Sequence, residues 1–141
     1  MKIYKFGGAS VKDAEGVKNL VTILNYLGHQ QTLIVVSAMG KTTNSLELVV
    51  KNYFDNKEDL QYSINEVFNF HNKILHDLFK EDNHQIFSEV NEIFENLRIF
   101  LKRNKSPDYS FVYDQVVSFG EILSTKIINS YLNYSSIPCN W

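Results

Sequence analysis

The chain has 141 residues, is 44% hydrophobic and 21% charged, and carries a formal net charge of −2. This length predicts one domain or part of one, with the composition of an ordinary globular protein. The near-neutral charge gives no reason to expect nucleic acid or an anionic membrane as a partner, and no apolar run approaches the ~18–20 residues that cross a bilayer. Strand-like sequence begins at residue 2, which leaves no place for a signal peptide, and the single Cys139 fits a reducing compartment. We therefore expect a cytoplasmic protein.

The first stretch runs from a short strand through two glycines into a helix. Residues 2–6 favour extended backbone, and Gly7 and Gly8 leave room for a ligand against the bare chain. Ser10, with Asp13 three residues later, is typical of a helix N-cap. A strand, a glycine turn and a helix N-terminus together aim N–H groups at one point, so this stretch predicts an anion site.

Lys5 places a cation near the end of the first strand, close to the two glycines. At an anion site its ammonium group would neutralise the bound charge. A surface lysine on an edge strand remains the alternative, because strand–glycine–helix arrangements are common in α/β proteins.

Residues 32–37 form a continuous β-branched run, which predicts a strand buried on both faces of a parallel sheet. Gly28 ends the intervening helix, so the three elements make a right-handed βαβ unit. The turn at residues 38–43 leads into a second helix, for which Asn44 and Glu47 are the expected cap. Because parallel strands end at the same edge of a sheet, this turn and the two glycines should face one crevice.

The middle of the chain predicts an antiparallel helical hairpin. No glycine occurs between residues 41 and 119, and two amphipathic patterns fill much of this span on either side of a turn at residues 81–83. We interpret residues 57–104, approximately, as a helical insertion packed beside the sheet.

The last part of the chain predicts a long helix and then a third strand. Pro107 suits the first position of this helix. Gly120 interrupts its apolar face, and beside Glu121 it indicates a bend or a close approach of the backbone to another group. A tolerated glycine and a solvated glutamate remain the alternative. Residues 136–141 are typical of the start of a strand.

The histidines show no metal-ligand spacing with carboxylates or with Cys139. We interpret all four as ordinary polar residues: His29, His71, His76 and His84. We assign no metal-ligating residue to this chain.

Three blocks of the sequence carry a resemblance to a known family. They are residues 5–11 (KFGGASV), residues 36–44 (VSAMGKTTN) and residues 117–125 (VSFGEILST). Together they resemble the aspartokinases of the amino acid kinase family, in the family's order and across the whole chain. Ala9, where many members have Thr, and Phe119, where many have His, are departures that remove no essential chemical group.

The resemblance implies an amino acid kinase-like three-layer αβα sandwich with a mostly parallel α/β sheet, of which residues 1–141 are the N-terminal portion of the catalytic domain. It implies transfer of the γ-phosphoryl group of ATP, with Mg²⁺, to the β-carboxylate of L-aspartate. The product, 4-phospho-L-aspartate, begins the route to lysine, threonine and methionine.

The resemblance also implies roles for eight residues. The nucleotide-binding residues are Lys5, Gly7, Gly8 and Ser10. The substrate-binding residues are Ser37, Thr43, Asn44 and Glu121. Lys5 is the implied catalytic residue, neutralising charge on the transferring phosphoryl group, and Glu121 suits the ammonium group of aspartate.

Half of the family's active site, including an arginine and an aspartate, lies in a later part of its kinase domain. We therefore expect the 141-residue chain alone to be inactive, and we expect a homo-oligomer. Two alternatives stay open: another member of the amino acid kinase family, and a non-catalytic binding module in which the helical hairpin is the binding surface.

Overall fold

The computed structural model describes residues 1–141, and the chain begins with a parallel βαβ unit. Strands β1 (Lys2–Phe6) and β2 (Thr32–Val36) pair in parallel, with Lys2 opposite Thr32 and Phe6 opposite Val36. Helix α1 (Ala14–Leu27) connects them and ends at Gly28, whose φ of 77° is in the region that favours glycine. The predicted α/β class and this crossover are confirmed.

Only one face of the two-stranded sheet is covered by helices. Successive side chains of a strand point to opposite faces, and Phe6 and Val36 on one face are buried in the core. On the other face Ile3, Leu33 and Val35 are 61%, 50% and 41% exposed. The prediction that the second strand is buried on both faces is therefore wrong for this structure, because β-branched composition does not reveal which faces have a neighbour.

Helix α1 starts later than its sequence indicated. Asp13 is the N-cap, and its Oδ1 accepts a hydrogen bond from the backbone N–H of Gly16 at 2.8 Å. Ser10 lies in a short 3₁₀-helix, Gly8–Val11, so the prediction of Ser10 as the cap is wrong. The 3₁₀ turn brings the chain to Asp13 before the α-helix begins.

Helix α2 (Thr42–Asp55) begins two residues before the expected cap at Asn44. Its N-cap is Lys41, which makes no capping hydrogen bond through its side chain. The Oε1 atom of Glu47 instead accepts a hydrogen bond from the hydroxyl of Tyr113 at 2.7 Å. The predicted Asn44–Glu47 cap is wrong because a residue distant in sequence uses the carboxylate.

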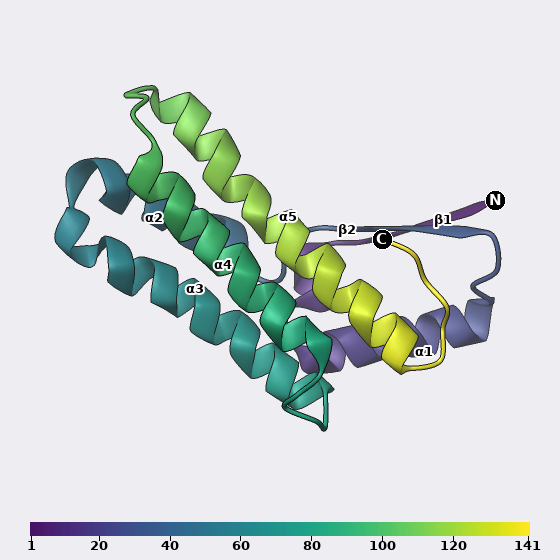
Figure 1. The fold of residues 1–141 in the computed structure, drawn as a ribbon. Coiled ribbons are helices and arrows are strands. Elements are labelled where there is room, and N and C mark those ends of the chain that lie inside the picture. The colour runs from purple at the N-terminus through teal and green to yellow at the C-terminus, as the bar shows by residue number, and fades with distance from the viewer.

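The predicted helical hairpin is confirmed by helices α3 (Lys57–Leu78) and α4 (Gln85–Arg103), which lie antiparallel (Figure 1). Helix α3 packs against α2, and α4 packs against α5 (Tyr109–Tyr134). In Figure 1 the hairpin extends away from the strands, and α5 runs diagonally from the hairpin back to the sheet. None of these helices combines the length and apolar character that a membrane crossing requires.

Helix α5 begins after a polar cap. Asp108 is the N-cap, and its Oδ1 accepts from the N–H of Phe111 at 3.2 Å. Pro107 therefore precedes the cap and does not occupy the first helical position, contrary to prediction. The Asp108 side chain accepts a hydrogen bond from a free N–H group of the first turn, which a proline side chain cannot do.

The segment after α5 is not a strand. Ser136, with a φ of 64°, reverses the chain, and the N–H of Ile137 bonds the carbonyl of Leu132 at 2.9 Å, as at a Schellman helix end. The side chain of Asn133 then bonds both the N–H and the carbonyl of Cys139, at 3.2 and 2.9 Å. The predicted strand at residues 136–141 is wrong in this structure, because a helix side chain takes the backbone groups that a strand would pair.

Candidate functional site

The loops that follow β1 and β2 meet at one edge of the sheet. We call residues 7–10 the first loop and residues 37–41 the second loop. The N–H of Ser37 donates to the carbonyl of Phe6 at 3.1 Å, and the N–H of Gly40 donates to the carbonyl of Gly8 at 3.0 Å. Both loops lie at the carboxyl ends of parallel strands, where open α/β sheets bind their ligands.

The two glycines of the first loop have different surroundings. A Cβ on Gly8 would lie 2.6 Å from the carbonyl oxygen of Ala38, so the second loop itself requires glycine there. A Cβ on Gly7 would meet nothing within 4 Å, and the φ of Gly7 is an ordinary −75°. The fold therefore does not require glycine at position 7. Because Gly7 has no side chain, however, there is open space at the end of β1. That space fits the close approach of a ligand such as a phosphate group.

Substituting the two glycines in the 141-residue chain should separate these roles. Gly8→Ala should destabilise the fold by about 1–3 kcal/mol, because its methyl group overlaps backbone that must move. Gly7→Ala should change stability by less than about 1 kcal/mol, with a stabilising sign from the reduced entropy of the unfolded chain. Urea denaturation of both variants measures the difference. Equal stability losses would contradict the distinct surroundings of the two positions.

Helix α5 completes this region from the opposite side of the second loop. A Cβ on Gly120 would lie 3.0 Å from the Cβ of Ala38, so the predicted close approach at this glycine is confirmed. One turn later, the Oγ of Ser124 donates to the carbonyl of Ser37 at 2.8 Å. Glu121 lies between Gly120 and Ser124 in the sequence, and its side chain is exposed. Ser124 was missed from the sequence, although its spacing of four residues from Gly120 puts it on the same helix face.

The N-terminus of α2 faces the same region without a side-chain cap. The first N–H groups of an α-helix have no partner within the helix and carry partial positive charge. The N–H of Thr42 donates to the Met39 carbonyl at 3.0 Å and that of Ser45 to the Lys41 carbonyl at 3.1 Å. Because Lys41 supplies no cap, the N–H groups of Thr43 and Asn44 are left for another acceptor. Thr43 is half-buried and Asn44 is exposed in this first turn. The arrangement favours an anion here.

The structure does not bring all the candidate side chains into contact. Lys5 is exposed, and strand alternation puts it on the uncovered sheet face with Ile3. The N–H of Ser10 bonds the carbonyl of Gly7 at 2.9 Å, while its side chain is exposed. The side chains of Lys5, Asn44 and Glu121 form no hydrogen bond or ion pair within the chain. No hydrogen bond or ion pair joins them to one another.

His71 is a second functional candidate that the sequence did not single out. It is fully buried on α3, and burial lowers the pKa of its imidazole to about 4, with a hydrogen bond to the carbonyl of Val67 opposing this shift. The prediction that His71 is an ordinary polar residue is therefore wrong. Its burial depends on how α3 packs against α2, which local sequence does not show.

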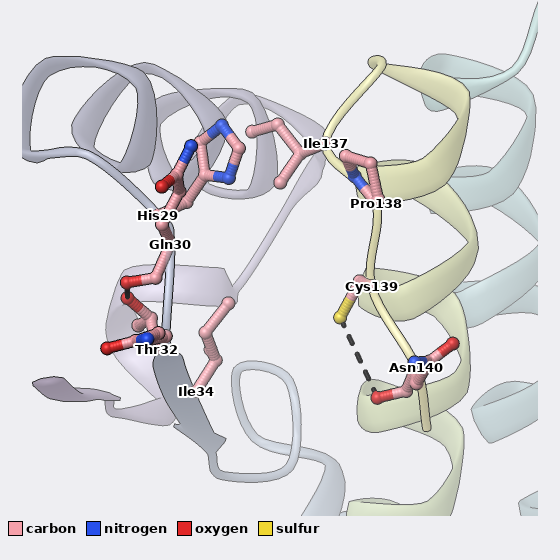
Figure 2. Close-up of a pocket in the computed structure, with 9 residues that line it drawn as sticks. His29, Gln30, Thr32, Ile34, Ile137, Pro138, Cys139 and Asn140 are labelled. Carbon is pink, nitrogen blue, oxygen red and sulfur yellow. Dashed lines mark hydrogen bonds between the residues drawn. The ribbon is translucent and has the colours of Figure 1, made fainter. Parts of the chain in front are cut away.

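A surface pocket of about 540 Å³ lies at the other end of the sheet. Figure 2 shows it between the chain entering β2 and the segment that follows α5. Its lining residues are His29, Gln30, Gln31, Thr32, Ile34, Ile137, Pro138, Cys139 and Asn140. None of the eight candidate residues lines it. Because ligands in such sheets bind at the carboxyl ends of the strands, we place the candidate site at the two loops.

Comparison with known proteins identifies the family. The model of the amino acid kinase family matches residues 1–141, which is the whole chain. The chain belongs to the amino acid kinase family. Among curated relatives of this kinase chain, aspartokinase 2, chloroplastic, of Arabidopsis thaliana is 31% identical over 93% of the chain. Bifunctional aspartokinase/homoserine dehydrogenase 1, chloroplastic, of Zea mays is 27% identical over 99% of it.

Solved structures agree on the fold of this amino acid kinase chain. Aspartokinase III of E. coli, in complex with aspartate and ADP, superposes with a TM-score of 0.82 over 96% of the chain at 23% sequence identity. The same enzyme in complex with lysine and aspartate gives a TM-score of 0.79. The chain covers 24% of the Arabidopsis relative, 15% of the Zea mays relative and 29% of the first of these structures, so it spans less than a third of the length of each. It therefore has the fold of the N-terminal portion of an aspartokinase.

Proposed function

We propose that this chain is the N-terminal part of the catalytic domain of an aspartate kinase. The observation that carries the proposal is the open space beside Gly7, next to the uncapped N-terminus of α2, in a chain whose curated relatives are aspartokinases. The reaction transfers the γ-phosphoryl group of ATP to the β-carboxylate of L-aspartate. A bond forms between a carboxylate oxygen and the γ-phosphorus, the bond from that phosphorus to the bridging oxygen of ADP breaks, and the products are 4-phospho-L-aspartate and ADP.

The first loop is the proposed phosphate site. Gly7 leaves room for a phosphate against the backbone, and Gly8 lets the second loop approach closely enough to hold that backbone in place. Lys5, near the end of β1, supplies the positive charge that the transferring phosphoryl group needs, and Ser10 supplies a hydroxyl in the 3₁₀ turn. Phosphoryl transfer depends mainly on positioning and charge neutralisation, and these groups would contribute to both at the first loop.

The second loop and the start of α2 are the proposed aspartate site. The N–H groups at the start of α2, with Thr43 and Asn44, suit a carboxylate of the substrate. Glu121 suits its ammonium group, and Ser37 lies where α5 contacts the loop. An aspartate carboxylate is already ionised near pH 7, since its usual pKa is about 3.9, and the reaction therefore needs no general base.

The proposed reaction also uses Mg²⁺. Mg²⁺ is usually held by one or two carboxylates together with substrate phosphates. No three His, Cys, Asp or Glu side chains come together in this structure to hold a metal ion. We assign no residue of this chain to Mg²⁺ and propose that it accompanies the ATP phosphates.

The proposed kinase needs more chain than these 141 residues. The curated relatives reported above are at least about four times as long, and we propose that the remainder supplies the rest of the nucleotide pocket. We call the protein that includes this remainder the complete kinase. We propose a homo-oligomer in the cytoplasm, where the free Cys139 thiol fits the reducing conditions, and we expect the 141-residue chain alone to be inactive.

The experiment that tests this function traps the acyl phosphate. The complete kinase, given Mg-ATP, L-aspartate and hydroxylamine, should form a coloured hydroxamate in proportion to aspartate. Glutamate and N-acetylglutamate are the matched controls, because they distinguish other amino acid kinases. Well-folded protein that makes no aspartate-dependent hydroxamate would refute the proposal, and a hydroxamate from either control would favour the corresponding kinase.

A further inference from the structure

A buried polar contact joins the helical hairpin to the second loop. The Nε2 atom of His71 on α3 lies 3.4 Å from the Oγ1 atom of Thr42, the first residue of α2. Both side chains are buried. The two residues are 29 positions apart, so the contact exists only because α3 packs against α2.

The neighbouring hydrogen bonds locate the protons. The Nδ1 atom of His71 lies 2.8 Å from the carbonyl oxygen of Val67, which can only accept, so Nδ1 carries the hydrogen and Nε2 carries a lone pair. The Thr42 hydroxyl donates to the carbonyl of Met39 at 2.6 Å. Its single proton is shared unequally: it is donated to the Met39 carbonyl at 2.6 Å, and Nε2 at 3.4 Å is the second, weaker acceptor. Burial keeps the ring neutral, which preserves Nε2 as an acceptor.

These contacts define the shape of the second loop. The backbone N–H of Thr42 also donates to the Met39 carbonyl, at 3.0 Å, so two bonds to one carbonyl close the loop onto α2. Helix α3 reaches the loop at a second point, since the end of the Phe70 ring lies 3.4 Å from where a Cβ of Gly40 would be. Thr43 follows directly, so the closure determines where this residue and the first N–H groups of α2 point.

We infer that His71 is a positioning residue for the aspartate site, acting through Thr42. It touches no substrate. It holds the second loop and the start of α2 in one conformation from the hairpin side, which makes the hairpin part of the functional site. The kinetic consequence rests on the proposed function, whereas the effect on the loop does not.

The effect on the loop is tested by amide hydrogen exchange of the 141-residue chain. His71→Leu removes both ring nitrogens at similar volume, and exchange at residues 38–43 should become about tenfold faster, as expected for the loss of one hydrogen-bonded contact. Thr42→Val should do the same and Thr42→Ser should not, because serine keeps the hydroxyl. Val90→Ala, a buried substitution on α4, is the control for a general loss of stability.

Two results would overturn the inference at this stage. One is unchanged exchange at residues 38–43 in His71→Leu. The other is acceleration of the same size in Val90→Ala, which would mean that the loop responds only to overall stability. If His71→Leu does not fold, His71→Gln is measured in its place: exchange at residues 38–43 near the wild-type rate supports the inference, and exchange accelerated as in Val90→Ala overturns it.

The second arm measures kinetics of the complete kinase. His71→Leu should raise the KM for aspartate about tenfold, with kcat and the KM for ATP within about twofold of wild type. His71→Gln should restore most of the loss, because its amide reaches the place of Nε2. An aspartate KM that stays at the Val90→Ala value would show that His71 does not position the site. If wild-type protein makes no acyl phosphate, the proposed function fails, and the exchange experiment still decides whether His71 holds the loop.

Discussion

Lys5→Ala in the complete kinase is expected to lower kcat by about 10²–10³, the usual loss when one preorganised electrostatic donor is removed. The charge is needed most while the phosphoryl group is transferring, so the KM values for ATP and aspartate should change much less. Lys5 is exposed and forms no ion pair, so its loss should alter stability by less than about 0.5 kcal/mol. Initial rates at saturating substrates, together with a denaturation curve, measure both quantities.

Two further variants make the Lys5 result specific. Lys2→Ala is the matched control, since Lys2 lies on the same strand and its Nζ donates to the carbonyl of Leu27 at 2.8 Å, at the other end of β1. It should leave kcat unchanged. Glu121→Gln should instead raise the KM for aspartate, because an ammonium partner acts in the ground state as well as the transition state. Near-normal kcat in Lys5→Ala would refute the phosphate role of this lysine.

The second large effect is a loss of stability in acid caused by His71. Its folded-state pKa of about 4 lies below the unfolded value of about 6.5 because the ring is buried. Between these two pH values the unfolded chain binds more protons, so the free energy of unfolding rises with pH. The contribution of the neutral His71 ring to the free energy of unfolding is fully present above about pH 6.5 and is lost as the pH falls to about 4. The shift corresponds to about 3 kcal/mol.

Urea denaturation of the 141-residue chain at several pH values between 4 and 7 measures this dependence. The contribution of His71 is the difference between wild type and His71→Leu, since this comparison removes the contribution of every other group. The variant should lose less stability on acidification than wild type does. Parallel curves for the two proteins would mean that the imidazole is not buried and neutral in the folded state.

Elements that depend on a local pattern could be predicted from the amino-acid sequence. A β-branched strand, a 3.6-residue apolar period and Gly28 at a helix end are properties of neighbouring residues, so the βαβ unit and the hairpin could be predicted. The glycine pair and Gly120 were also visible, because a missing side chain in a defined pattern indicates a turn or a close approach. The three blocks of the candidate site were found by their resemblance to a known family, and the structure brings their backbones together.

Features that depend on residues far apart in the chain could not be predicted in this way, because they follow from how whole elements pack. Helix α2 starts at Thr42 and not at Asn44, because the Met39 carbonyl and α3 hold Thr42 there, while Tyr113 uses the Glu47 carboxylate. The sheet has one bare face, and residues 136–141 bond to α5 instead of pairing as a strand. The burial of His71 also depends on residues far apart in the chain, because α3 must pack against α2 to cover it. Burial and hydrogen-bond partners are set by the packing of whole elements, and a residue's immediate neighbours in sequence carry little information about that packing.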